Sequence, residues 1–280
     1  MRFEDFARSH GLIIRDIVPH RWISTPTEDH PRKRNGRYKF MGDYGWVQNW
    51  ATMPKPSLWQ NDTKTITPIQ IKQAIRDDNK RRQEDADAAA RKAAKILHSC
   101  RQAPHIYLEN KGFPDEIGNV LDDEDGSRKL VIPMRLNGRL IGAQLINEQG
   151  EKKFLYGQRT KGAAFVMDAK GIPMFCEGFA TALSVRAVMK AIKLRYSIYV
   201  CFSAFNIQEV ANSVSGGIVI ADNDPNHVGE TSAKNTSKPY WISDTVGEDF
   251  NDYHRRVGIF KASQSLKKII VQNNALPLSL

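Results

Sequence analysis

The last hundred residues alternate short apolar runs with amphipathic runs, and this alternation restricts the fold more than any other feature. Three runs are short and rich in β-branched or aromatic residues, which predicts buried strands: IPMFCEG (172–178), YSIYVCFS (196–203) and GGIVIADND (216–224). The runs between them have the length and pattern of helices: TALSVRAVMKAI (181–192) and NIQEVANSV (206–214). Because strands that alternate with helices form a parallel sheet through right-handed crossovers, we predict an α/β fold over residues 171–280.

Acidic residues follow two of these predicted strands. The first strand ends at Glu177 and the third at Asp222 and Asp224. Ligands of an open parallel sheet bind beyond the carboxyl ends of its strands. Alternation along an extended segment puts Asp222 and Asp224 on one side of the chain. Glu177 joins them if the first and third strands are neighbours.

Three crowded carboxylates repel one another unless a cation neutralises them. Mg²⁺ fits this role, because it prefers oxygen ligands and keeps waters that substrate phosphates can replace. One or two such ions can activate a 3′-hydroxyl and stabilise the charge that develops at phosphorus. We therefore predict a metal-dependent catalytic site at Glu177, Asp222 and Asp224. Acidic residues also end strands as turn formers or helix caps, so a single Asp-x-Asp is weak evidence by itself.

The segment 103–170 has a different pattern, which predicts an antiparallel meander. Short apolar runs are separated by Asn137-Gly138, a hairpin turn signal, and by the weaker signal Gln149-Gly150. Before it, residues 63–102 are predicted to form a helical connector, with Thr67 as the N-cap and Pro68 at the first helical position. The mixed charges and alanines of this connector indicate a solvated helix.

The N-terminal segment 1–62 is predicted to be a small β-rich region that binds nucleic acid. Asn35-Gly36 is a hairpin signal. Basic residues surround it and aromatic residues follow, a combination that suits single strands because bases stack on rings and phosphates meet cations. The alternative is a small sheet whose tryptophans form its core. The candidate nucleic-acid contacts, with one later lysine added, are Arg32, Lys33, Arg34, Arg37, Lys39 and Lys161.

The formal net charge of +10 favours a polyanionic partner, although a basic surface that only aids solubility has the same composition. The three cysteines form no C-x-x-C pair, so we expect neither a zinc site nor a disulfide framework. No apolar run is long enough for a membrane span, and the first residues lack the apolar core of a secretory signal. We expect a cytoplasmic protein with no membrane partner.

The two acidic motifs, in this order, resemble those of the Toprim family. MFCEGFATALSV resembles its glutamate motif and IVIADNDPNHVG its Asp-x-Asp motif. The chain is more specifically similar to the catalytic core of the bacterial and phage DNA primases, over about residues 105–260. The softer matches are IYLENKGF (106–113), the strand region that begins at Arg128 and Lys129, KKFLYG and GEDFNDYHRRVG.

The resemblance implies a Toprim-like parallel sheet with flanking helices, preceded by a β-rich basic subdomain and a small N-terminal segment. It implies Mg²⁺ or Mn²⁺ at the acidic residues, with Asp249 near the metals and Asn251 or Asp252 close by. Lys153, Arg128 and Lys129 would hold triphosphate or template phosphates. Thr181 stands where the family often has an aspartate, and the N-terminal segment lacks the cysteines of the family's zinc ribbon.

Three functions remain open at this point. The first is a primase, a DNA-directed RNA polymerase and nucleotidyltransferase from a phage or mobile element, which would use a single-stranded DNA template and ribonucleoside triphosphates for DNA replication. Because no helicase motif is present, unwinding would come from a replicative helicase in trans. The second is a Toprim nuclease, in which the same acids activate water. The third is a non-catalytic nucleic-acid-binding protein that keeps the fold.

Overall fold

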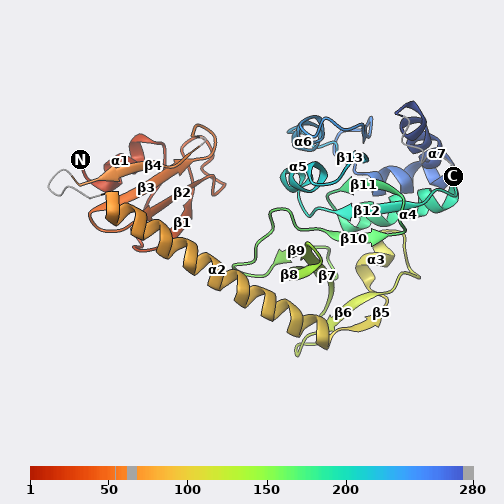
Figure 1. The fold of residues 1–280 in the computed structure, drawn as a ribbon, viewed down its shortest axis with the longest axis horizontal. Helices are drawn as coiled ribbons and strands as arrows, with labels where there is room; N and C mark the ends of the chain where they lie inside the picture. Colours follow the sequence, from red (N-terminus) through yellow and green to blue (C-terminus); the bar gives the residue numbers. More distant parts are fainter. Residues whose placement is uncertain (54, 62–67, 274–280) are drawn as a thin grey trace. The chain divides into compact units, whose positions relative to one another are not determined.

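The chain forms two compact units, Met1–Lys80 and Arg81–Leu280. The computed structural model describes residues 1–53, 55–61 and 68–273 (Figure 1). No helix within these described ranges has the length and apolar character needed to cross a membrane.

The first unit is built on an antiparallel sheet in the order β1-β2-β3-β4. Helix α1 (Phe3–Ser9) packs against one face, where Phe3, Tyr38, Val47 and Trp59 form a small core. This face excludes water, and the opposite face carries the remaining tryptophans of the sheet. The strands are β1 (Trp22–Thr25), β2 (Gly36–Phe40), β3 (Tyr44–Asn49) and β4 (Ser57–Gln60).

The predicted turn at Asn35-Gly36 is wrong. Gly36 is the first residue of β2, paired with Thr25 on one side and Asn49 on the other. A Cβ at this position would lie 2.7 Å from the Cγ2 atom of Thr27, so the glycine allows close packing inside the sheet and does not form a turn. The hairpin turn lies instead between β2 and β3, where Gly42 has a φ of +89°.

Helix α2 (Pro68–Ser99) matches the predicted connector, and the boundary between the two units falls inside it. The predicted N-cap Thr67 lies outside the described residues. In the second unit, Ala89 and Ala93 pack against Val131, Ala143 and Leu155. The second half of the connector is therefore solvated on one side only, and its other side covers one face of the meander.

The meander is confirmed, with strand order β5-β6-β7-β8-β9. Asn137 and Gly138 connect β7 to β8 with φ values of 50° and 78°, as a two-residue hairpin turn with two positive φ angles requires. The short helix α3 (Ile106–Asn110) lies between β5 and β6. The strands are β5 (Arg101–Ala103), β6 (Gly118–Asp122), β7 (Arg128–Leu136), β8 (Arg139–Ile146) and β9 (Lys152–Phe154).

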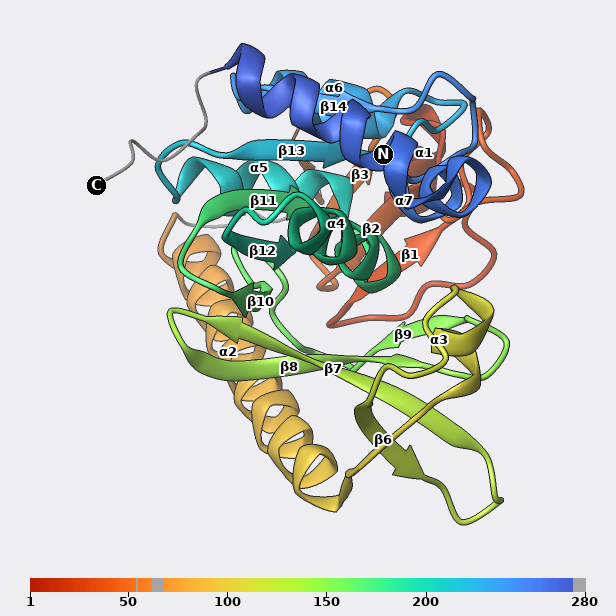
Figure 2. The same cartoon turned by 90° about the vertical axis from the view of Figure 1, so that its right-hand side faces the viewer.

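The predicted α/β fold with a parallel sheet is also confirmed. The sheet order is β10-β12-β11-β13-β14, in which β12, β11, β13 and β14 run parallel and β10 joins the edge antiparallel. Helices cover both faces (Figure 2). The strands are β10 (Phe165–Asp168), β11 (Ile172–Cys176), β12 (Tyr196–Val200), β13 (Ile218–Ala221) and β14 (Tyr240–Ile242).

Alternate residues of the central strands point to different helices. Met174 and Ile220 belong to the core that includes α4 and α7, whereas Phe175 and Val219 belong to the core that includes α5 and α6. Both faces of the sheet are therefore buried at its centre, which explains why strands β11 and β13 are apolar throughout. The helices are α4 (Phe179–Ala191), α5 (Ala204–Asn212), α6 (Val228–Lys234) and α7 (Phe250–Gln272).

The change of sheet falls between β9 and β10, before the predicted division at residue 170, because β10 already belongs to the α/β sheet, and it is not a change of core. Leu130 and Ile146 of the meander share one buried cluster with Met174 and Leu183 of the α/β region. The two sheets of the second unit are thus fixed against each other through common apolar contacts, and residues from β9 can reach the edge of the parallel sheet.

Candidate active site

The carboxyl ends of β11 and β13 bring the predicted acidic residues to one edge of the sheet. The two strands are parallel neighbours, with Cys176 in register with Ile220. Glu177 directly follows β11, and Asp222 directly follows β13. Glu177 was predicted to join the aspartates only if these two strands are neighbours, and they are.

Asp222 lies in the least favourable environment for a carboxylate. Its Oδ1 atom is buried and has no hydrogen-bond partner in the part of the chain that the structure describes. Burial, together with the negative charges of Glu177, Asp249 and Asp224, raises the pKa of Asp222 to about 8, although the positive charge of Lys152 acts in the opposite direction. An isolated buried charge is costly, so without a cation this group favours its neutral form.

Glu177 shares this environment. Burial raises the pKa of its carboxyl group, and the charge of Asp224 adds to the effect. Lys152 and a hydrogen bond from the backbone N–H of Ala204 both lower the pKa. Because the same neighbours act on Glu177 and Asp222, these acids lie within electrostatic range of one another.

The turn after β13 is held by the polypeptide around it. The Nδ2 atom of Asn223 donates to the carbonyl of Ser243 at 3.0 Å, and its backbone N–H donates to the carbonyl of Glu248 at 3.3 Å. Gly229 of α6 packs directly on this turn, because a Cβ there would lie 2.2 Å from the carbonyl oxygen of Asp222. The backbone that carries Asp222 is thus fixed before any ligand arrives.

Asp249 is the fourth acid of this edge. It caps α7, with its Oδ1 accepting a hydrogen bond from the N–H of Asp252 at 2.8 Å, and its charge raises the pKa of both Glu177 and Asp222. Asn251 points elsewhere: it is fully buried, and its Nδ2 donates to Ser184 Oγ and to the carbonyl of Lys111. Asn251 therefore joins α7 to α4.

The donor set suits a hard divalent cation. No group of three or more His, Cys, Asp or Glu side chains is arranged to hold a metal ion as the side chains stand in the described ranges. Mg²⁺, however, is usually bound through one or two carboxylates and completes its shell with water and substrate phosphates. The unpartnered oxygen of Asp222 and the like charges around it fit such an ion.

The cation beside these acids is Lys152 and not its predicted neighbour Lys153. In β9, Lys152 pairs with Ile146, and Lys153 pairs with Leu145. Cross-strand partners share a face, so Lys152 lies on the face of the common core and Lys153 on the face toward α2. A Cβ built on Gly178 would lie 3.7 Å from the Nζ atom of Lys152, which places this ammonium at the edge of the sheet.

Arg128 and Lys129, the other predicted phosphate ligands, are engaged at the start of β7. The Nε of Arg128 donates to Glu148 Oε1 at 3.0 Å, and Lys129 forms an ion pair with Asp123. The cation whose charge lowers the pKa of both Glu177 and Asp222 is Lys152.

The predicted nucleic-acid contacts of the first unit fall into two groups. Arg32, Lys33 and Arg34 are exposed in the loop before β2. Lys39 is a correction: its side chain is only 5% exposed and forms an ion pair with Asp78 at 2.8 Å, so it is not available to DNA in this structure.

Arg37 is also held within the first unit. Its guanidinium lies 4.4 Å from the ring centre of Trp22, and its Nε donates to Gln48. Trp22 therefore packs against Arg37 on the face of the sheet opposite the core. In the second unit, the predicted contact Lys161 is largely exposed and pairs with Glu209 at 2.9 Å.

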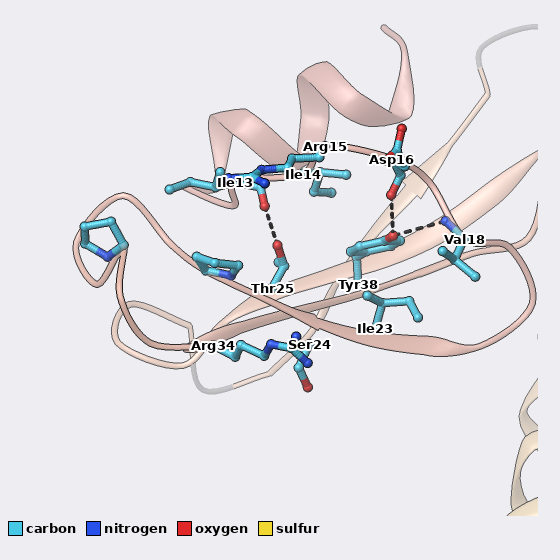
Figure 3. Close-up of a pocket in the computed structure, with 12 residues that line it drawn as sticks. Ile13, Ile14, Arg15, Asp16, Val18, Ile23, Ser24, Thr25, Arg34 and Tyr38 are labelled. Carbon is cyan, nitrogen blue, oxygen red and sulfur yellow. Dashed lines mark hydrogen bonds between the residues drawn. The ribbon is translucent and has the colours of Figure 1, made fainter.

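A hollow of about 690 Å³ opens on the first unit, between the segment 13–18 and strands β1 and β2. Figure 3 shows that its polar groups bond to each other: the hydroxyl of Tyr38 donates to the carbonyl of Asp16 and accepts from the N–H of Val18. Thr25 donates to the carbonyl of Ile13 in the same way. These bonds attach the loop to the sheet, and the hollow lacks the crowded like charges of the acidic edge.

The chain is similar in sequence to a known DNA primase. The chain is 29% identical over 180 residues to the DNA primase TraC of Escherichia coli. The matched region covers 60% of this chain but only 16% of TraC. The predicted resemblance to the bacterial and phage DNA primases is confirmed by this similarity. No protein-family model matches the chain.

Two solved structures are more distantly similar. One is a chain in a structure of the bacteriophage T7 lagging-strand DNA polymerase interacting with primase domains, with 14% identity, a TM-score of 0.43 and coverage of 63% of this chain and 93% of that one. The other is a DNA primase domain from Pseudomonas aeruginosa, with 15% identity, a TM-score of 0.36 and coverage of 55% and 56%. Neither TM-score reaches 0.5.

Because the carboxyl group of Asp222 is buried, we expect Asp222→Asn to stabilise the metal-free protein. The folded-state pKa of about 8 exceeds the ordinary value of 3.8, so the folded state binds the proton more tightly and stability falls as pH rises from about 4 to about 8. Asp222→Asn removes this loss. Denaturant unfolding in a chelator should show the variant more stable by about 3 kcal/mol at pH 8, with the difference shrinking toward pH 4.

The exposed Asp115 provides the control, because Asp115→Asn removes the same charge from a solvated position. It should change the free energy of unfolding by less than about 0.5 kcal/mol. Equal effects of the two substitutions would mean that Asp222 carries no special electrostatic cost.

Proposed function

We propose that this chain carries the catalytic core of a DNA primase, which synthesises short RNA primers on single-stranded DNA by metal-dependent nucleotidyl transfer. The observation that carries the proposal is the edge of the parallel sheet, where Asp222 has a buried, unpartnered oxygen and further acids surround it. The similarity to the primase TraC supports this function over others that a crowded acidic site allows. The chain spans a small part of that protein, so its activity is transferred here as a proposal.

Glu177, Asp222, Asp224 and Asp249 are the residues that would hold Mg²⁺ or Mn²⁺. A bound ion of this kind would supply activation of the attacking 3′-hydroxyl and stabilisation of charge at phosphorus. Thr181 cannot add a carboxylate to this set, because its side chain is neutral; it is also buried, at 1% exposure.

The residues of the chain itself prepare the edge for a phosphate. The N–H of Ala204 hydrogen-bonds Glu177 and orients its carboxylate. Lys152 supplies a positive charge beside Gly178, where the missing side chain leaves room for a phosphate to approach the backbone. Lys152 therefore takes the role that the resemblance assigned to Lys153, which is to hold a nucleotide or template phosphate.

The first unit would present the single-stranded template. Arg32, Lys33 and Arg34 are exposed in one loop, which we call the basic loop. Their side chains can bind successive phosphates of a single strand. Ribonucleoside triphosphates are the second substrate. A replicative helicase acting in trans remains part of the proposal, because unwinding must precede priming on duplex DNA.

Primer synthesis tests the proposal directly. Purified protein with single-stranded DNA, ribonucleotides and Mg²⁺ or Mn²⁺ should give short RNA products. Asp222→Asn should lower the rate on the order of 100-fold or more, because the carboxylate that best fits the ion is removed. Gel separation of products labelled from a radioactive ribonucleotide measures the rate.

Asp115→Asn is the matched control here as well, and it should leave the rate unchanged. Metal-dependent cleavage of DNA or RNA without synthesis would favour the nuclease. Nucleic-acid binding with no metal-dependent chemistry, on varied templates, would reduce the function to binding alone.

The basic loop predicts a weaker salt dependence of DNA binding when its charges are removed. We expect the slope of log affinity for oligothymidylate against log salt to become shallower when Arg32, Lys33 and Arg34 are replaced with serine. The slope should change by up to about 2, since each phosphate contact on a single strand contributes about 0.7 to it. Fluorescence anisotropy at several salt concentrations measures this slope.

The control removes the same charge from the exposed lysines of α7, by replacing Lys261, Lys267 and Lys268 with serine. A slope that changes equally in both variants would show that only net charge matters. In that case the basic loop would have no specific role in holding the strand.

A further inference from the structure

An exposed phenylalanine stands beside the acidic edge and has no role in the site as described so far. Phe154 ends β9 and is 45% exposed. Its ring contacts the ring of Phe202 at a centroid distance of 6.3 Å and an interplanar angle of 78°. Phe202 is buried and its backbone N–H donates to the carbonyl of Glu177 at 2.9 Å. A chain of two contacts therefore connects the exposed ring to a catalytic carboxylate residue.

The register of β9 fixes the direction of this ring. Phe154 pairs with Gln144 and Lys152 pairs with Ile146, so both side chains leave β9 on the same face. Two residues of extended strand separate their Cα atoms by about 6.6 Å. A cation and a flat apolar surface thus stand side by side at one edge, as recognition of a phosphate and its base requires.

Phe202 is held in a conformation that bulky residues rarely adopt. Its φ angle is +68°, in the left-handed region. Such backbone strain persists only where the surroundings impose it, and it concentrates at ligand clamps and active sites. Here the strained residue is the second one after β12, and its ring contacts the ring of Phe154. This contact restricts the motion of Phe154 while a large part of the ring remains open to solvent.

We infer that Phe154 is a stacking platform for an unpaired nucleobase at the acidic edge. The ligand chemistry is the flat face of a base whose phosphate lies near Lys152. The base belongs either to the single-stranded template or to the incoming ribonucleotide. The ribonucleotide is a candidate ligand only because of the proposed function, on which this part of the inference rests. Phe154 would bind the base and take no part in bond formation.

Substitutions at Phe154 test the platform through binding. Phe154→Ala should raise the Kd for oligothymidylate, or the KM for a ribonucleotide in primer synthesis, about 5-fold or more, since stacking on one ring has at least this effect. Phe154→Leu preserves apolar bulk against Phe202 and should show the same loss, whereas Phe154→Trp should restore binding. A change in Kd alone assigns the base to the template, and a change in KM alone assigns it to the incoming nucleotide.

Phe260→Ala is the control, because Phe260 is an exposed phenylalanine, at 72%, on α7 and away from β9. It should alter neither constant. If Phe154→Ala and Phe154→Leu, with unfolding midpoints like that of the wild type, change neither constant more than 2-fold, the platform is refuted.

The two proposals fail separately. A wild-type protein that binds oligothymidylate and ATP but makes no primer would refute the proposed function. The platform would then be decided by the Kd values of the Phe154 variants for these two probes. If the wild type binds neither probe, the platform is refuted as well.

Discussion

Repulsion among carboxylates at one edge of a parallel sheet is the constraint around which the second unit is organised. Glu177 and Asp222 end neighbouring strands, and the charges of Asp224 and Asp249 act on both. A fold does not gain stability from such an arrangement, because buried charge without a partner is unfavourable. The acids therefore have to be held in place by contacts that do not involve their own charges.

Those contacts can be identified. Strand pairing between β11 and β13 fixes the first two acids, and the hydrogen bonds of Asn223 fix the turn that carries the third. The N-cap at Asp249 is supported from behind by Asn251, whose amide joins α7 to α4. Apolar contacts from the meander then set β9, with Lys152 and Phe154, against the same edge. Stability from the core thus offsets the electrostatic cost of the site.

The sequence predicted the parallel sheet and the positions of its acids, because both follow from local pattern. Apolar runs of strand length identified β11, β12 and β13, and the residue after each run was then known. Whether β11 and β13 are neighbours is a matter of topology, which local pattern does not contain. The meander was predicted for the same reason, through the two positive-φ residues at Asn137-Gly138.

The errors arose where a residue's surroundings come from distant segments. Lys152 and Lys153 are chemically equal, and only the register of β9 decides which one reaches the acids. Lys39 was expected on the surface, but Asp78 of α2 covers it. Gly36 was interpreted as a turn residue, although its lack of a side chain serves packing against Thr27. Adjacent sequence carries no signal for any of these contacts.

The central claim is that this acidic edge binds a divalent cation through Asp222. Crystals grown with Mn²⁺ and measured at the manganese absorption edge test it most directly. The account predicts an anomalous peak at bonding distance, about 2.2 Å, from a carboxylate oxygen of Asp222, with Glu177 or Asp224 in the same shell. An ordered, well-resolved edge with no manganese, or with the metal bound only at other residues, would contradict it.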